Sequence, residues 1–96
     1  MRVLAKINIP VEAGNRAIKD GSLPQLLDGF MAKVKPETAF FGLDGGKRTM
    51  FVVFDLASPA DIPPLFEPLF VGFDAQVDIQ PVMDQADLQK GLSSLG

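Results

Sequence analysis

The first apolar residues of the chain alternate with polar ones, and this pattern predicts a half-buried β-strand over residues 3–9. The side chains on its apolar face are Val3, Ala5, Ile7 and Ile9. Leu4, Lys6 and Asn8 fall on the other face, because successive residues of a strand point to opposite sides of a sheet. Pro10 then ends the strand.

Apolar residues at helical spacing follow this strand. Residues 11–20 predict a short helix, after which Gly21 suits a left-handed backbone position. Ser22 is expected to open a longer helix through a capping box with Gln25, and Pro36 ends that helix. Its apolar stripe consists of Leu23, Leu26, Leu27, Phe30, Met31 and Val34.

Two further apolar runs, residues 38–43 and 47–56, predict a β-hairpin. Asp44, Gly45 and Gly46 separate them and supply the positive φ angles that a tight hairpin turn requires. Because the turn precedes a strand and not a helix, it lacks the geometry of a phosphate-binding loop.

A second long helix is predicted after Ser58, an N-cap residue, with Pro59 in its first position. Pro68 lies inside the helical pattern and predicts a short or kinked helix, which Gly72 would end. The apolar residues at helical spacing are Ile62, Leu65, Phe66, Leu69 and Phe70.

The pattern returns to alternation over residues 75–83, which predicts a last strand with Val77 and Ile79 on one face. Its polar face carries Gln76, Asp78 and Gln80. Asp84 is expected to cap a short tail helix whose apolar residues are Leu88, Leu92 and Leu95.

This order of elements predicts one α+β domain over residues 1–96. Right-handed crossovers fold it into a ferredoxin-like β-α-β-β-α-β arrangement, with a four-stranded antiparallel sheet and a short C-terminal helix. The two long helices then cover one face of the sheet, and the first and last strands are neighbours.

The other face of the sheet is unusually apolar. Residues 50–54 are apolar at both parities, and Phe40 and Phe41 repeat this in the neighbouring strand, as in strands that are buried on both sides. An exposed apolar face marks an interface, so we expect a homodimer through the sheet face. The alternative is that the tail helix folds back over it.

Composition removes several classes of site. The chain of 96 residues has no cysteine and no histidine, which removes disulfides, thiolate nucleophiles and the usual zinc and haem ligands. We therefore expect no metal and no cofactor. No apolar run approaches the roughly 20 residues of a membrane span, and the charges of Arg2 and Lys6 interrupt the first apolar run as no signal peptide would. A cytoplasmic protein is the expectation.

The net charge of −3 argues against nucleic acid and anionic membranes as partners. RNA-recognition domains share the expected topology, and the strand beginning at Lys47 resembles part of their motif. However, Arg48 and Thr49 occupy the positions of its glycine and its central stacking aromatic residue. We expect no nucleic-acid binding.

A family resemblance rests on turn residues and spacing along nearly the whole chain. The residues that carry it are Lys35-Pro36-Glu37, Asp44-Gly45-Gly46-Lys47-Arg48, Asp55, Pro59, Ile62-Pro63, Glu67-Pro68, Phe70, Val77 and Pro81-Val82-Met83. With these residues the chain resembles small uncharacterised bacterial proteins of the dimeric α/β-barrel superfamily. The resemblance implies two ferredoxin-like sheets closed into a barrel whose interior holds a small ligand. The superfamily includes cofactor-independent monooxygenases, muconolactone isomerases, haem-handling proteins and amino-acid-binding regulatory domains, so it implies no single function.

The polar faces of the first and last strands supply the candidate ligand-binding residues. Lys6 and Asn8 are expected beside Asp78 and Gln80, facing away from the helices, with Asp55 joining them at the end of its strand. A lysine and an aspartate on an apolar wall can orient a polar ligand or shift a pKa into a useful range. The simpler interpretation is a structural cross-strand pair at the rim of the barrel.

Glu67 is a further candidate, because it lies among apolar residues of the second long helix. Solvent exposure is its expected position, whereas a buried carboxylate there would be a candidate acid or base.

Two hypotheses of function follow. The first is a dimeric barrel that binds a small molecule, with a cofactor-independent oxygenase or isomerase as its catalytic form. The second is a non-catalytic assembly or regulatory module whose sheet face is only a dimer interface. The volume of the space between the sheets separates them, and no motif in the chain names a reaction.

Overall fold

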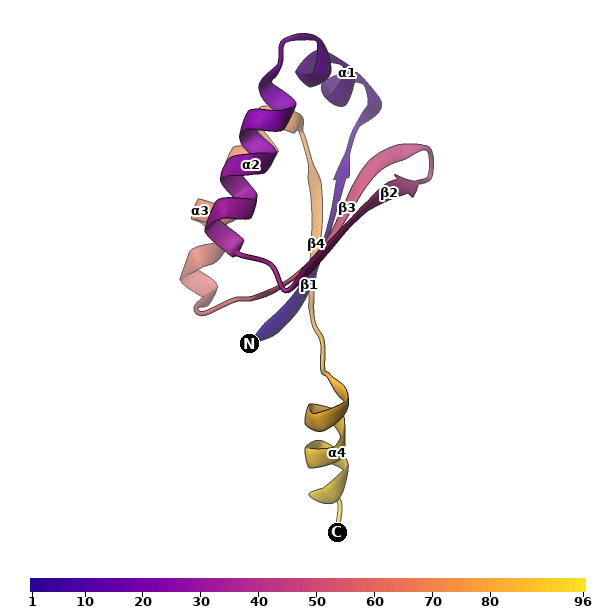
Figure 1. Ribbon diagram of the computed structural model, residues 1–96, viewed down its shortest axis with the longest axis vertical. Coiled ribbons are helices and arrows are strands. Elements are labelled where there is room, and N and C mark those ends of the chain that lie inside the picture. Colours follow the sequence, from indigo (N-terminus) through magenta and orange to yellow (C-terminus); the bar gives the residue numbers. More distant parts are fainter.

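The computed structural model describes residues 1–96 and contains one four-stranded antiparallel sheet (Figure 1). The strand order across the sheet is β2-β3-β1-β4, so the first and last strands are neighbours as expected. The protein is therefore an α+β structure, compatible with a ferredoxin-like fold. The strands are β1 (Arg2–Ile9), β2 (Thr38–Asp44), β3 (Lys47–Asp55) and β4 (Gln76–Pro81).

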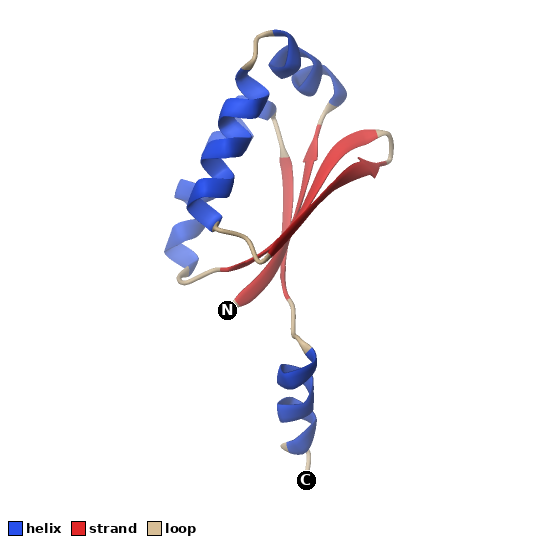
Figure 2. Cartoon of the chain, in the orientation of Figure 1, coloured by secondary structure: helices blue, strands red, loops and turns tan.

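The two longest helices lie on the same side of the sheet, and a short helix connects the end of β1 to the first of them (Figures 1 and 2). The C-terminal helix lies apart from the body, beyond the end of β4. No helix combines the length and the apolar character that a membrane crossing needs. The helices are α1 (Val11–Lys19), α2 (Ser22–Val34), α3 (Ile62–Phe73) and α4 (Gln85–Ser93), with a 3₁₀ turn η1 (Pro59–Asp61) before α3.

Most turns form where the sequence predicts them. Gly21 has φ of 78°, and Gly45 and Gly46 have φ of 59° and 77°, the left-handed values that these turns require. The Ser58 side chain accepts a hydrogen bond from the Ala60 amide at 3.1 Å. Asp84 caps α4 as expected, accepting from an amide in its first turn at 2.8 Å.

The capping box predicted for α2 is wrong. Ser22 is the first residue of the helix, and its amide donates a hydrogen bond to Asp20 Oδ1 at 2.9 Å. Gly21 takes the N-cap position, so no side chain is available there. The cause is the tight left-handed turn that joins α1 to α2, which shifts the start of the helix.

Helix α3 is not shortened by its internal proline. It continues through Pro68 for 12 residues and ends at Phe73, followed by Asp74 in the left-handed region. Gly72 lies inside the helix and does not end it. A Cβ atom at Gly72 would lie 2.6 Å from the Leu26 side chain, so this glycine permits the close approach of α2.

The core lies between the sheet and the helices, on the side we call the covered face. The alternating residues of β1 and β3 that point there are almost fully buried. At the centre, the Phe66 ring lies 5.6 Å from Phe30 and 6.3 Å from Phe54, between ring centroids. The core side chains are Val3, Ala5, Ile7, Ile9, Ala17, Leu23, Phe30, Val34, Met50, Val52, Phe54, Leu56, Phe66, Leu69, Phe73 and Ala75.

The opposite side of the sheet, here called the uncovered face, has no helix over it (Figure 2). Phe51 and Val53 are half-buried there, and Phe40 is 66% exposed. The alternative in which the tail helix folds back over this face is wrong for this structure, because α4 projects away from the sheet (Figure 1). The residues of the uncovered face are Leu4, Lys6, Asn8, Thr38, Phe40, Gly42, Thr49, Phe51, Val53, Gln76, Asp78 and Gln80.

Candidate functional site

The predicted ligand-binding residues form rows across the uncovered face. Lys6 is the register partner of Asp78 on one side and of Phe51 on the other, and Phe51 in turn pairs with Phe40. One row therefore runs from an exposed aromatic ring, past a half-buried one, to an ammonium and a carboxylate. The parity assigned to Lys6 from the sequence is confirmed, because the neighbouring residues of β1 lie in the core.

The neighbouring rows extend this surface. In the row through Leu4, Gln80 lies beside Leu4, and in the row through Asn8, Gln76 and Thr49 lie on either side of Asn8. Four of the six predicted residues, Lys6, Asn8, Asp78 and Gln80, thus lie on one continuous surface.

Lys6 has a different ion-pair partner from the one its register suggests. Its ammonium pairs with Asp44, at the tip of the β2–β3 hairpin. The hydrogen bond to Asp44 and its charge, helped by the charge of Asp78, raise the pKa of Lys6. Lys6 is therefore a firmly protonated hydrogen-bond donor near neutral pH, and not a general base or a nucleophilic amine.

Asn8 is fixed by a threonine that sequence analysis did not single out. The Thr49 hydroxyl donates to Asn8 Oδ1 at 2.7 Å and lies 3.0 Å from the Lys47 carbonyl oxygen. Thr49 is only 3% exposed, and it is the one polar residue among the buried side chains. The sequence contained a signal for this contact. Thr49 lies two residues before Phe51 and therefore points to the same face, where its hydroxyl lies opposite Asn8.

Asp78 and Gln80 lie on β4, an edge strand, and both are exposed. No cationic group lies within ion-pair distance of Asp78, since the ion pairs of the chain involve other carboxylates. Asp78 thus presents a free carboxylate beside an ammonium that is already paired with Asp44.

Asp55 and Glu67 do not join this group. Asp55 lies opposite Arg2 in the sheet and accepts a hydrogen bond from the Met1 amino group at 2.7 Å. Asp55 does not reach Lys6 as predicted. The residue of β3 opposite Lys6 is Phe51, and Asp55 lies four residues further along that strand. Glu67 is exposed on α3, the position expected for it, and has no ion-pair partner.

A cluster of charges surrounds Arg2 at the end of the sheet near Asp55. The guanidinium lies 2.6 Å from Glu37, 3.2 Å from Asp84 and 3.3 Å from Asp87, measured between the nearest nitrogen and oxygen atoms. The hydrogen bond and charge of Glu37, followed by those of Asp84, raise the pKa of Arg2. The Asp87 amide, together with the charge of Arg2, lowers the pKa of Asp84. We call this cluster the Arg2 clamp, because it ties the start of α4 to β1.

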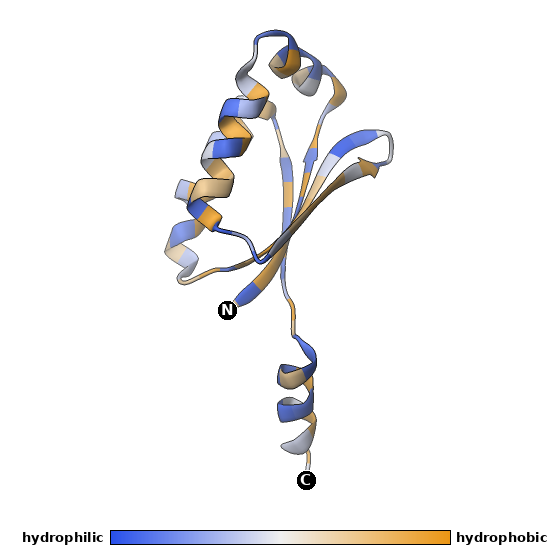
Figure 3. Cartoon of the chain, viewed as in Figure 1, coloured by the Kyte–Doolittle hydropathy of each residue, from blue (hydrophilic) through white to orange (hydrophobic).

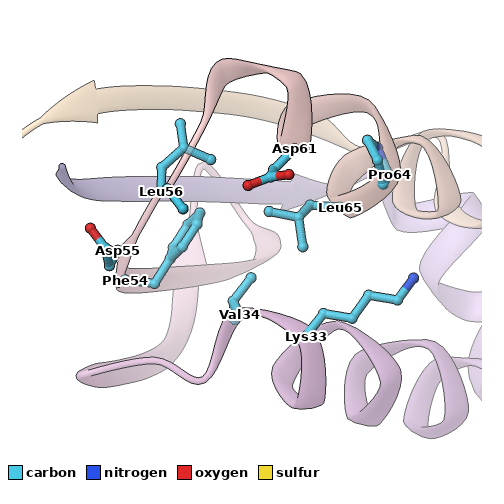
Figure 4. Close-up of a pocket in the computed structure, with 9 residues that line it drawn as sticks. Lys33, Val34, Phe54, Asp55, Leu56, Asp61, Pro64 and Leu65 are labelled. Carbon is cyan, nitrogen blue, oxygen red and sulfur yellow. The ribbon is translucent and has the colours of Figure 1, made fainter.

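The largest hollow, about 610 Å³, is an open one beside Arg2, Glu37 and Asp55. A cavity of about 300 Å³ lies on the helix side (Figure 4). Lys33 from α2 and Asp61 from η1 lie on opposite sides of it. A second groove, of about 210 Å³, lies between α2 and the strand β2 and is lined by Leu23, Leu27 and Phe41 among others. No cavity of the chain is lined by Lys6, Asn8 or Asp78.

The uncovered face is therefore a surface, and a single chain does not enclose a ligand there. No group of three or more acidic side chains has the arrangement of a metal site. Compared with models of known protein families and with curated protein sequences, the chain matches none of them.

Proposed function

We propose that two copies of this chain pack their uncovered faces together as a dimeric α/β barrel and bind a small molecule between the two sheets. The observation that carries the proposal is the row Phe40, Phe51, Lys6 and Asp78, which joins apolar rings and charged groups on a face without cover.

Exposure of the aromatic residues supports the dimer. Burying a phenylalanine contributes about 1.5–3 kcal/mol, and Phe40 is 66% exposed in the single chain. Sheets that pack face to face lie about 10 Å apart, so a second copy would cover Phe40, Phe51 and Val53 together. A surface of this kind on a soluble domain is typical of an interface.

The free carboxylate of Asp78 indicates the chemistry of the ligand. Covering the face removes water from Asp78, and a buried carboxylate needs a hydrogen-bond donor or a cation. Lys6 is committed to Asp44. We therefore propose a ligand with an aromatic or apolar body for Phe40 and Phe51, and an amine or hydroxyl group for Asp78. Asn8 and Gln80 would add amide contacts.

The protonated state of Lys6 favours binding over catalysis by that residue. If the barrel is an enzyme of the cofactor-independent oxygenase or isomerase type, Asp78 is the candidate catalytic carboxylate, because it has no ion-pair partner on this face. The competing proposal is the assembly or regulatory module, in which the rings of Phe40 and Phe51 fill the space between the sheets and leave no lumen.

The first test is the mass of the protein in solution. Light scattering at micromolar concentration should give about twice the chain mass of 10.3 kDa. A monomer at these concentrations contradicts both the barrel and the module.

The second test separates the barrel from the module with two probes of opposite charge. Tyramine, an aromatic amine, should raise the melting temperature of the dimer in proportion to its binding, and phenylacetate should do so far less. Asp78→Asn should abolish the tyramine effect, whereas Asp28→Asn, which removes an exposed carboxylate of α2, should leave it unchanged. A dimer that neither probe stabilises supports the module.

A further inference from the structure

Helix α4 has an apolar stripe that no other part of its own chain buries. Leu88 and Leu92 recur at helical spacing and are 45% and 56% exposed, and no residue of α4 is buried. The helix ends at Ser93, so Leu95, which the sequence placed in it, lies in the turn that follows and is 80% exposed. Figure 3 shows that hydrophobic and hydrophilic segments follow one another along α4. Lys90, the one basic residue of the helix, lies on the side opposite to Leu88 and Leu92.

A helix of this kind is not stable without support. Isolated helices shorter than about 12–15 residues are marginal in water, and α4 has 9 residues with Gly91 in its interior. The capping box of Asp84 and Asp87 stabilises only its first turn. The remaining support has to come from packing of the leucine stripe against another surface.

The direction of α4 is fixed at its base. The Arg2 clamp holds Asp84 and Asp87, and the Val82 amide donates to the Arg2 carbonyl oxygen at 3.1 Å. The connection from β4 is therefore tied to β1, and α4 continues past the end of the sheet (Figure 1). The leucine stripe of α4 therefore lies away from the sheet and the other helices of its own chain.

The same chain carries an exposed apolar surface that matches the stripe. Strand β2 is an edge strand, and Phe40, Phe41 and Leu43 are 66%, 63% and 77% exposed. An apolar edge strand needs cover to avoid non-specific pairing. Phe41 also lines the groove of about 210 Å³ between β2 and α2, which is bounded by Leu23 and Leu27. From residue 38 to residue 43 the strand has no charge, like the stripe.

We propose that α4 of one copy docks along β2 of a second copy, with Leu88 and Leu92 over Phe41 and the adjoining groove. This inference rests on the proposed dimer and adds a second contact to it. In one chain, β1 and β3 separate β2 from β4, and α4 points away from both. In a symmetric dimer, α4 of each copy would lie on β2 of the other, so both apolar surfaces of both copies would be covered.

The area needed for a stable dimer supports a second copy as the occupant. Standard interfaces bury about 800 Å² on each partner. The uncovered face alone offers one strongly exposed aromatic ring, Phe40, because Phe51 and Val53 are already half-buried and most of the other side chains are polar. Fully covering a phenylalanine buries about 150–250 Å², so a contact that includes Phe41, Leu43 and the two leucines of α4 would supply much of the area that the sheet face lacks.

The absence of cysteine makes a site-directed cross-link clean. Chains with Leu92→Cys are mixed with chains with Phe41→Cys and oxidised under mild conditions. The expected product is a mixed covalent dimer of these two chains. The matched control, Lys90→Cys mixed with Phe41→Cys, should give several-fold less, because residue 90 lies on the opposite side of the same helix. Equal yields from both mixtures would overturn the proposed contact, and so would a full-chain Leu92→Cys/Phe41→Cys variant that closes its disulfide within one chain.

A second measurement separates this contact from the sheet-face dimer. The full-length Leu88→Ser/Leu92→Ser variant should weaken dimerisation by roughly two orders of magnitude, since two apolar side chains lose their burial in each reciprocal contact. Unchanged dimerisation would overturn the α4 contact and leave the sheet-face dimer standing. Conversely, if Phe51→Asp leaves the dimer intact while Leu88→Ser/Leu92→Ser dissolves it, the α4 contact holds and the sheet-face proposal fails.

Discussion

The two faces of the sheet both carry apolar side chains, but the helices of the chain cover only one of them. Neighbouring residues of β3, Val52 and Phe51, are both apolar, yet Val52 is fully buried under the helices and Phe51 is half-buried on the open side. The covered face completes its packing within one chain. The uncovered face carries Phe40, Phe51 and Val53 among polar side chains, and no helix of its own chain covers them. The proposed dimer would supply that cover.

The largest expected effect comes from the covered face. Phe66→Ala removes a fully buried ring that contacts Phe30 and Phe54, and should lower the free energy of unfolding by about 3–5 kcal/mol. Urea denaturation followed by circular dichroism measures the loss. Phe40→Ala is the control, because its ring is 66% exposed, and should cost less than about 1 kcal/mol at dilutions where dimers dissociate. Equal losses of unfolding free energy in Phe66→Ala and Phe40→Ala would contradict the conclusion that only the covered face is packed within one chain.

The next effect is on assembly. Phe51→Asp places a charge at the centre of the uncovered face, where an unpaired buried carboxylate would oppose association. The mass in light scattering should fall to that of one chain, 10.3 kDa, while the circular dichroism spectrum stays that of a folded protein. Gln25→Glu, which adds a charge at an exposed position of α2, outside the uncovered face, should remain dimeric. If both variants stay dimeric, the dimer does not use this face.

A smaller effect is expected at the boundary between the faces. Thr49→Val keeps the shape of a buried side chain but removes the hydroxyl that donates to Asn8. Loss of one hydrogen bond should lower the free energy of unfolding by about 0.5–1.5 kcal/mol. Thr38→Val, on an exposed position of β2, is the control and should change it little at dilutions where dimers dissociate. A stability equal to wild type would show that the Thr49–Asn8 bond is replaced by water without loss.

The smallest effect concerns pH and the attachment of α4. The pKa of Asp84 is lowered by the Asp87 amide and by Arg2. A carboxylate whose pKa is lowered by folding stabilises the folded arrangement above its ordinary pKa of about 3.9, and loses that contribution as the pH falls below it. The amide chemical shifts of α4 should therefore be constant from about pH 7 to 5 and move at lower pH. Movement of these signals between about pH 5 and 7 would contradict the role of Asp84. Asp28→Asn should leave the acid transition unchanged.

The candidate site shows how far the sequence alone leads. Alternation placed Lys6 and Asn8 on one face with Asp78 and Gln80, because a strand has a period of two residues and a shift of one would bury both charges. The partner of Lys6 was not predictable in the same way. The twist of the sheet and the course of the β2–β3 hairpin bring Asp44 to the ammonium, and neither follows from spacing along the chain.

The fate of the last helix shows the same limit. The sequence predicted a capped helix after Asp84 with a leucine stripe, since capping and periodicity are local properties. It left open whether the helix folds back over the sheet. Arg2, more than 80 residues earlier in the chain, decides this by holding Asp84 and Asp87 at the end of β1.

The sequence by itself thus determined the elements, the turns, the parity of every strand and the existence of an apolar face that two helices do not cover. These depend on backbone geometry and on neighbours within a few residues. Only the tertiary structure decided which charges meet, that Asp78 stays unpaired, that Asp55 lies apart from Lys6, and that α4 points away from its own sheet. Those outcomes depend on the relative positions of side chains from distant segments, which packing and sheet twist set together.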